Sequence, residues 1–262
     1  MTPDRWASGD LYEPYVGRWS RRVAEVFLPW IGAPRRAAWL DVGCGTGALV
    51  ETIVASTHPR RVKGIDPSEG FLATARARVS DPRVSFEVAD AQALPDENGA
   101  FEAVVSGLVL NFVPKPEVAA SEIARVLKPG GIAAAYLWDY AGKMQLMRHF
   151  WNAAGALDPA ARDKDEGRRF PLCEPEAMRR LWEGAGLRRV EVAAIDVETT
   201  FRDFDDYWTP FLSGQAPAPG YCMSLSEDAR VRLRERLRES LPYAIDGSIP
   251  MVARAWAVCG RR

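Results

Sequence analysis

The chain has 262 residues and a formal net charge of −1, and 47% of its residues are hydrophobic. This length and composition fit one α/β domain with an insertion, and the near-zero charge argues against a nucleic-acid-binding surface. Arginines do gather between residues 230 and 238. Leucines and glutamates alternate with them at helical spacing, so we interpret this stretch as the solvated face of an amphipathic helix.

The cysteines, Cys44, Cys173, Cys222 and Cys259, are far apart and form no CxxC pair. Neither a metal site nor a disulfide framework is therefore expected. The first residues lack a basic region followed by an apolar run, and no apolar stretch is long enough to cross a bilayer. We expect a cytoplasmic protein that holds no metal and has neither membrane nor nucleic acid as a partner.

Short apolar runs alternate with amphipathic segments in the first half of the chain. In chain order the pattern predicts a helix at 18–30, a strand at 39–42, a helix at 48–55, a strand at 62–65, a helix from a Ser68 cap to 79, strands at 84–89 and 101–105, a helix at 117–127 and a strand at 132–137. Runs of Val, Ile, Leu and Ala without alternation are typical of strands buried on both faces. The alternation predicts an α/β fold with a doubly wound, mostly parallel sheet.

The rhythm breaks after Trp138. The next segment has a mostly helical pattern rich in aromatic residues, and strands return at 190–195 and 252–258 as a pair that can close one sheet edge in antiparallel fashion. We expect a single domain, 1–262, whose parts are an N-terminal arm and helix (1–38), a core (39–138), a lid insertion (139–186) and C-terminal strands and helices (187–262).

The strongest local signal is the run from Leu40 to Gly47, in which Gly43, Gly45 and Gly47 follow a strand and open a helix. Such a loop lets backbone N–H groups approach a ligand. A dinucleotide loop and an S-adenosylmethionine loop both fit the glycines. Asp41, two residues before Gly43, favours the second, because a carboxylate repels a pyrophosphate and attracts a sulfonium or ammonium group.

These residues resemble the first motif of class I S-adenosylmethionine-dependent methyltransferases, the group that includes quinone-biosynthesis C-methyltransferases and many small-molecule methyltransferases. The remaining matches are Asp66 with Pro67, Asp90 with Ala91, Ser106, and the turn Lys128–Gly131. The resemblance implies a seven-stranded Rossmann-like sheet in which Asp66 binds the ribose hydroxyls. It also implies that Asp90 and the Ala91 backbone bind the adenine and that the strand ending at Ser106 lies under the methionine part.

Three segments are expected around the methyl group. The candidates are Tyr12, Tyr15, Arg18 and Trp19 in an aromatic arm, Asn111 after the fourth strand, and Trp138, Tyr140, His149 and Trp151 after the fifth. Tyr15 and Arg18 are predicted to contact the cofactor, and Tyr12, Trp19, Trp138 and Trp151 to contact the acceptor. The aromatic residues also suit simple packing, and Arg18 also suits a surface salt bridge.

His149, Tyr140 and Asn111 are the candidates for a catalytic role. Many relatives carry a histidine pair where this chain has Asn111, which can orient an acceptor but cannot act as a base. His149 has a suitable titration range, although a surface or packing role fits it too. We predict methyl transfer to a small, apolar or aromatic acceptor. A methyltransferase acting on protein or RNA, a non-catalytic cofactor-binding protein and a nicotinamide enzyme are the alternatives.

Overall fold

The computed structural model describes residues 16–214 and 216–262. Tyr12 and Tyr15, both predicted for the site, lie outside the described residues. The described part forms two compact units. The sheet unit comprises Ser20–Leu137, Leu172–Ile195 and Ala255–Arg262, and the helical unit comprises residues 16–19, Trp138–Pro171 and the described part of Asp196–Arg254.

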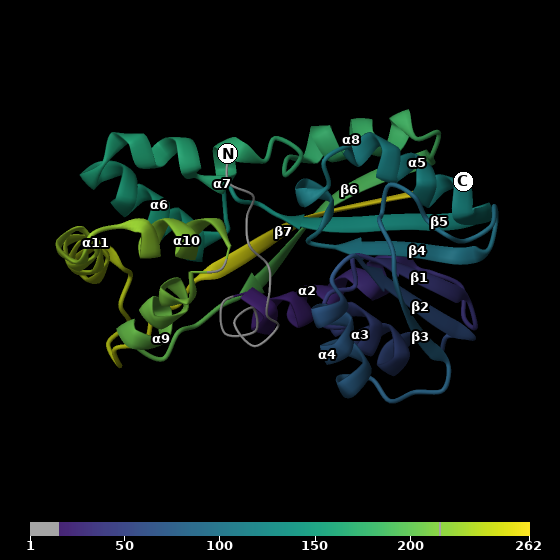
Figure 1. The fold of residues 1–262 in the computed structure, drawn as a ribbon, viewed down its shortest axis with the longest axis horizontal. Coiled ribbons are helices and arrows are strands. Elements are labelled where there is room, and N and C mark those ends of the chain that lie inside the picture. The colour runs from purple at the N-terminus through teal and green to yellow at the C-terminus, as the bar shows by residue number, and fades with distance from the viewer. Residues whose placement is uncertain (1–15, 215) are drawn as a thin grey trace. The chain divides into compact units, whose positions relative to one another are not determined.

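Seven strands form one sheet in the order β3-β2-β1-β4-β5-β7-β6 (Figure 1). They are β1 (Ala38–Val42), β2 (Arg61–Asp66), β3 (Val84–Val88), β4 (Phe101–Gly107), β5 (Leu127–Trp138), β6 (Arg188–Glu198) and β7 (Val252–Arg261). The pairs β1–β2, β1–β4, β2–β3 and β4–β5 are parallel. Strand β7 runs against β5, because Gly130 bonds to Arg262 at one end and Asp139 to Arg254 at the other. The predicted doubly wound, mostly parallel α/β sheet is confirmed.

Strand β5 begins earlier than the predicted residue 132. Phe101 pairs with Leu127 and Ala103 pairs with Ile132, so the register shifts between them. The predicted turn before the strand is therefore a bulge within it. Gly130 has a left-handed φ of 78° there, a conformation that favours glycine.

Among the described residues, five α-helices belong wholly or mainly to the sheet unit. They are α2 (Arg18–Ile31), α3 (Ala48–Thr57), α4 (Glu69–Arg78), α5 (Pro116–Val126) and α8 (Pro175–Gly184). Ser68 caps α4 as predicted, since its hydroxyl accepts a bond from the Phe71 N–H at 3.3 Å. Helices α5 and α8 lie side by side (Figure 1). The buried Trp182 anchors α8 by donating its indole N–H to the Ala133 carbonyl at 3.3 Å. Residues of the expected lid segment 139–186 therefore divide between the two units.

The helical unit has an aromatic interior. Its helices are α6 (Gln145–Leu157), η3 (Pro159–Lys164), α7 (Glu166–Arg169), α9 (Phe204–Trp208), η4 (Thr209–Ser213), α10 (Pro217–Ser224) and α11 (Glu227–Ser240). Phe150 stacks on Phe211 with ring centroids 4.4 Å apart, and Trp151 meets Phe150 edge-on at 5.2 Å. The arginine-rich α11 is amphipathic as predicted, with Leu233 and Leu237 buried. No helix within the described ranges has the length and apolar character that a membrane span needs.

Candidate functional site

The glycine loop connects β1 to α3 in a conformation that side chains disfavour. Gly43, Gly45 and Gly47 have φ values of 74°, 52° and 85°. The N–H groups of Gly43 and Cys44 both donate to the Ile65 carbonyl at 2.8 Å, which fixes the loop to β2. Helix α3 begins directly after Gly47 without a side-chain cap. An uncapped helix start leaves backbone N–H groups for a ligand.

Asp41 lies on β1 just before this loop and is only 1% exposed. Both of its carboxyl oxygens are buried and have no hydrogen-bond partner among the described residues. Burial, and then the neighbouring Asp66, raise the pKa of Asp41 to about 8. A buried polar group without a partner is costly, so this carboxyl needs either a proton or a cationic ligand.

Asp66 ends β2 and supports the loop from the other side. One carboxylate oxygen accepts from the Gly45 N–H at 3.0 Å, and the other accepts from the Ser68 N–H at 2.9 Å. Burial raises the pKa of Asp66, and these two backbone bonds oppose that rise. A carboxylate has about four acceptor sites. Asp66 can therefore hold the loop and still accept bonds from two hydroxyl groups, while Pro67 beside it is exposed.

Asp90 follows the end of β3 and is exposed. Its carboxylate accepts a bond from the Gln92 backbone N–H at 2.9 Å and bonds from the Gln92 side-chain amide at 3.1 and 3.2 Å. Ala91, between them, is buried. The predicted cofactor acids thus lie at or just beyond the carboxyl ends of three adjacent parallel strands in the sheet unit, as expected for ligands that bind at the carboxyl ends of strands.

The end of β4 and the residues after it include one polar side chain that is already hydrogen-bonded and one that is not. Ser106 is buried, and its hydroxyl donates to the Val42 carbonyl at 2.8 Å, so it joins β4 to β1. Further along, the Val109 side chain fills the space beside Gly43, where an added Cβ would lie 2.5 Å from the Val109 Cγ1 atom. Asn111 lies in η2 (Leu110–Phe112), and its amide nitrogen and oxygen are both buried without a partner among the described residues. The Asn111 amide can therefore form hydrogen bonds with a ligand, whereas the Ser106 hydroxyl already donates its proton to Val42.

The site residues predicted from the end of β5 and the segment after it belong to the helical unit. Trp138 is 1% and Tyr140 5% exposed, and Tyr140 packs against Phe170 with centroids 5.7 Å apart. His149 is half-buried on α6, and burial lowers its pKa. The lowered pKa favours the neutral imidazole, which is the form that a general base requires.

Trp151 lies in the interior of the helical unit and donates its indole N–H to Glu166. Glu166 is 1% exposed, and its second carboxyl oxygen has no partner within the described ranges. Burial is the main reason why the pKa of Glu166 rises to about 7. Sequence reasoning missed this group, because it lies in a charged stretch, Asp163-Lys164-Asp165-Glu166, that reads as surface.

In this structure Arg18 forms a salt bridge and Trp19 packs against a neighbouring ring, as the alternative to a site role predicts. The Arg18 guanidinium pairs with Asp206 at 3.1 Å and lies over the rings of Trp19 and Phe201 at 4.4 and 4.8 Å. Trp19 is buried and meets Phe201 edge-on. A role for either residue at the cofactor or the acceptor stays a prediction.

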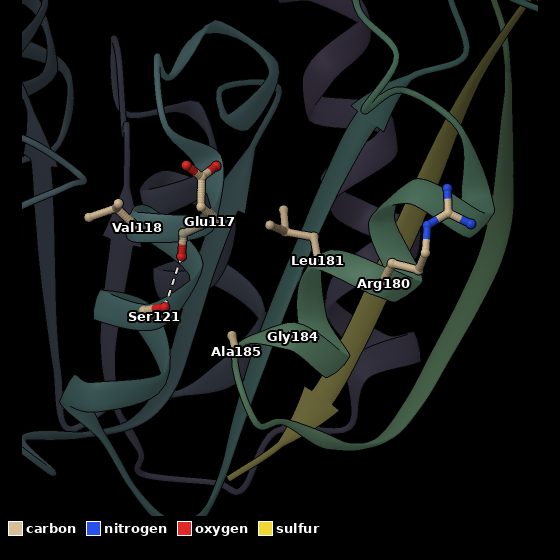
Figure 2. A pocket seen from close by; sticks show the side chains of 7 residues that line it. All are labelled: Glu117, Val118, Ser121, Arg180, Leu181, Gly184 and Ala185. Carbon is tan, nitrogen blue, oxygen red and sulfur yellow. Dashed lines mark hydrogen bonds between the residues drawn. The ribbon is translucent and has the colours of Figure 1, made fainter.

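Helices α5 and α8 border a groove in the sheet unit, with a volume of about 320 Å³ (Figure 2). Val118 and Leu181 line it, and Glu117 and Arg180 add charge. None of the predicted site residues takes part. Among the described residues no three His, Cys, Asp or Glu side chains form a cluster that suits a metal ion.

The glycine loop and its acids fit S-adenosylmethionine on structural grounds. A Cβ added at Gly45 would meet no atom within 4 Å, so space is open above the loop. The unpartnered carboxyl of Asp41 offers a counter-charge for a cation, and Asp66 retains acceptor sites for ribose hydroxyls.

Comparison with known proteins agrees with this fit. Residues 40–135 match a family model described as a methyltransferase domain. The chain is 30% identical over 129 residues to a trans-aconitate 2-methyltransferase of Variovorax paradoxus, covering 49% of each chain. It is 34% identical over 114 residues to the ubiquinone/menaquinone biosynthesis C-methyltransferase UbiE of Desulfotalea psychrophila, covering 44% of this chain and 45% of the relative. The chain thus spans about half the length of these curated relatives.

A solved structure is similar over most of the chain. Phosphoethanolamine N-methyltransferase 2 of Haemonchus contortus, in complex with phosphomonomethylethanolamine and S-adenosylhomocysteine, has a TM-score of 0.58 and 19% identity. The match covers 92% of this chain and 52% of that one. At this identity the match supports the fold alone. Together, the matched domain, the sheet order and the glycine loop with its strand-end acids place residues 40–135 in the class I S-adenosylmethionine-dependent methyltransferase family.

Proposed function

We propose that the protein transfers a methyl group from S-adenosylmethionine to an oxygen, nitrogen or carbon atom of a small, apolar or aromatic molecule. The observation that carries the proposal is the enclosed carboxyl of Asp41 beside an open glycine loop. A carboxylate there opposes a pyrophosphate and favours a cationic donor.

The chain's own residues bind and orient the donor. Asp66 would accept bonds from the ribose hydroxyls while it holds the loop through Gly45. Asp90 and the Ala91 backbone would recognise the adenine edge, and Asp41 would lie near the charged methionine part. The cofactor supplies a methyl group already activated by a sulfonium, so the protein's main tasks are alignment and exclusion of water.

Asn111 is the best-supported candidate for contact with the acceptor in the sheet unit. Its amide is buried, has no partner among the described residues and follows Val109, which packs beside Gly43. An amide donates and accepts hydrogen bonds but does not take up a proton at neutral pH. We therefore propose that Asn111 orients the acceptor, and that Tyr140 and His149 are further candidates for contact with it.

Three considerations support a small acceptor. The relatives are named for methylation of trans-aconitate and of quinone precursors. The net charge of −1 offers no broad basic surface for RNA. Within the described residues, the matched domain is accompanied by a helical unit with an aromatic interior. Modification of protein or RNA, and cofactor binding without catalysis, are the rival functions.

Two measurements test the proposal. Calorimetry should detect binding of S-adenosylmethionine and S-adenosylhomocysteine but not of NAD, and tight binding of NAD alone would refute the cofactor assignment. Transfer of a labelled methyl group should then be screened over phenols, quinones, amines and carboxylates. Labelling of protein or RNA substrates, with no small-molecule product, would favour the rival functions.

We also propose a cytoplasmic location. The cysteines Cys44, Cys173, Cys222 and Cys259 are all buried free thiols, which is compatible with a reducing compartment. Their oxidation state in protein isolated without reductant would test this.

A further inference from the structure

The Asp41 carboxyl lies on a fully buried strand inside the sheet. All five residues of β1 are buried, and β1 pairs with β2 on one side and β4 on the other. Asp41 faces Gly64 and Val105 in register, neither of which can donate a side-chain hydrogen bond. An ionised carboxylate in such surroundings, without hydrogen bonds or a counter-charge, is far less favourable than its neutral acid.

The groups around Asp41 also favour its neutral acid over its carboxylate. From β2, Asp66 raises the pKa of Asp41 further. From the loop, Cys44 has a thiol whose pKa burial raises well above its usual value, so it stays neutral. From β4, the Ser106 hydroxyl donates to the Val42 carbonyl instead. Arg76 acts on the Cys44 thiol but is not among the groups that shift Asp41.

We propose that Asp41 couples donor binding to a proton: it is a neutral acid in the free protein and ionises when the cationic methionine part of the cofactor binds. The inference rests on the proposed function only in taking S-adenosylmethionine as the ligand. The carboxyl O–H bond breaks, the oxygen keeps the electron pair, and the proton passes to the solvent buffer. The ligand's ammonium or sulfonium group then supplies the positive charge that the free site lacks.

This coupling makes affinity depend on pH in a defined direction. Binding lowers the pKa of Asp41 from its free-state value of about 8, so a proton is released and affinity rises as the pH increases toward 8. For a single released proton the dissociation constant falls by up to tenfold per pH unit, or about 30-fold between pH 5.5 and 7.0. The ligand's own amino group remains largely protonated in this range.

Calorimetry measures the proton directly. Titrations at pH 6.5 in phosphate and in imidazole, buffers with small and large ionisation enthalpies, yield the number of protons released. We expect about one proton for S-adenosylmethionine and for S-adenosylhomocysteine, since both carry an ammonium group. We expect none for 5′-methylthioadenosine, which keeps the nucleoside and sulfur but has neither cation.

The matched variants are Asp41→Asn, which keeps the shape of the side chain, and Asp90→Asn, which removes an exposed acid of the same site. Asp41→Asn should abolish proton release on binding and flatten the pH dependence of the dissociation constant. Asp90→Asn should still release the proton, whatever its affinity for the cofactor. If Asp41→Asn does not fold, the ligand comparison on the wild-type protein still decides.

Several results would overturn the inference. These are binding of S-adenosylmethionine without proton exchange at pH 6.5, an equal release with 5′-methylthioadenosine, or an undiminished release in Asp41→Asn. Failure of every sulfur nucleotide to bind is a different outcome, which would overturn the proposed function and this inference together.

Discussion

Gly43 is the position where the loop conformation and its packing can be separated by mutation. Its φ of 74° is left-handed, and an added Cβ would lie 2.5 and 2.6 Å from the two methyl carbons of Val109. Left-handed strain costs an alanine about 1–2 kcal/mol. Overpacking against a half-buried valine costs about 1–3 kcal/mol. We therefore expect Gly43→Ala to lower the free energy of unfolding by about 2–5 kcal/mol.

Two further variants isolate these contributions. Gly32 also has a left-handed φ, 56°, but an added Cβ there meets nothing within 4 Å. Gly32→Ala should therefore show the strain alone, about 1–2 kcal/mol. Gly43→Ala/Val109→Ala removes the two closest contacts, those with the Val109 methyl carbons, and leaves one of 2.9 Å with the Cβ of residue 109. The free energy of unfolding that the double variant loses should therefore be smaller than the sum of the two single losses, by about 1–3 kcal/mol.

Urea unfolding of the cofactor-free protein, followed by circular dichroism, measures all four variants with the wild type. Additivity of Gly43→Ala and Val109→Ala within about 0.5 kcal/mol would refute a clash between the two side chains. A loss in Gly43→Ala no larger than that in Gly32→Ala would refute it too. Either result would mean that the loop moves away from Val109 at little cost.

Three further predictions concern binding, turnover and pH. Asp66→Ala should weaken S-adenosylmethionine binding by about 1–3 kcal/mol, because it removes the proposed acceptor for the ribose hydroxyls and the partner of the Gly45 N–H; an unchanged dissociation constant in a folded variant would refute it. Trp138→Ala should lower turnover more than His149→Ala does, when each rate is divided by the concentration of enzyme that binds the cofactor. If His149 is instead the general base, His149→Ala should lower turnover by about 10²–10⁴-fold. Burial raises the pKa of Glu166 from 4.5 to about 7. In the unfolded chain Glu166 therefore ionises at a lower pH than in the folded protein, and the free energy of unfolding falls by about 3 kcal/mol as the pH rises from 4.5 to 7. Glu166→Gln should remove that fall between pH 5 and 7, and an unchanged slope in urea unfolding would contradict the burial argument.

The sheet was predictable because buried parallel strands leave a simple pattern. Short apolar segments located β1 to β4 within two residues, although β3 alternates and is only partly buried, and the Ser68 cap predicted the start of α4. The start of β5 was not predictable in the same way. Lys128–Gly131 contains proline and two glycines and reads as a turn, yet pairing of Leu127 with Phe101 carries the strand past it as a bulge.

Which of the two units each helix belongs to was harder to predict. An amphipathic pattern indicates that a helix has an apolar face, but it does not say which surface that face covers. Helix α8 was expected in the lid segment, and it packs instead in the sheet unit through Trp182. Likewise, a run of five charged residues, Arg162 to Glu166, gave no sign that Glu166 is buried against the Trp151 indole.

The positions of the strand-end acids were easier to predict than the surroundings of the acceptor candidates. Asp41 and Asp66 take their positions from strand ends, which the sheet fixes. Acceptor contacts depend on which polar side chains remain without a partner after packing, and a sequence pattern does not reveal this. Trp151 was expected at the acceptor, but its ring is in the aromatic interior and its N–H is donated to Glu166. Asn111 has both amide atoms buried without a partner in the described part of the chain. An unsatisfied buried amide gains more from a ligand than a satisfied indole does, so Asn111 is the acceptor contact to test first.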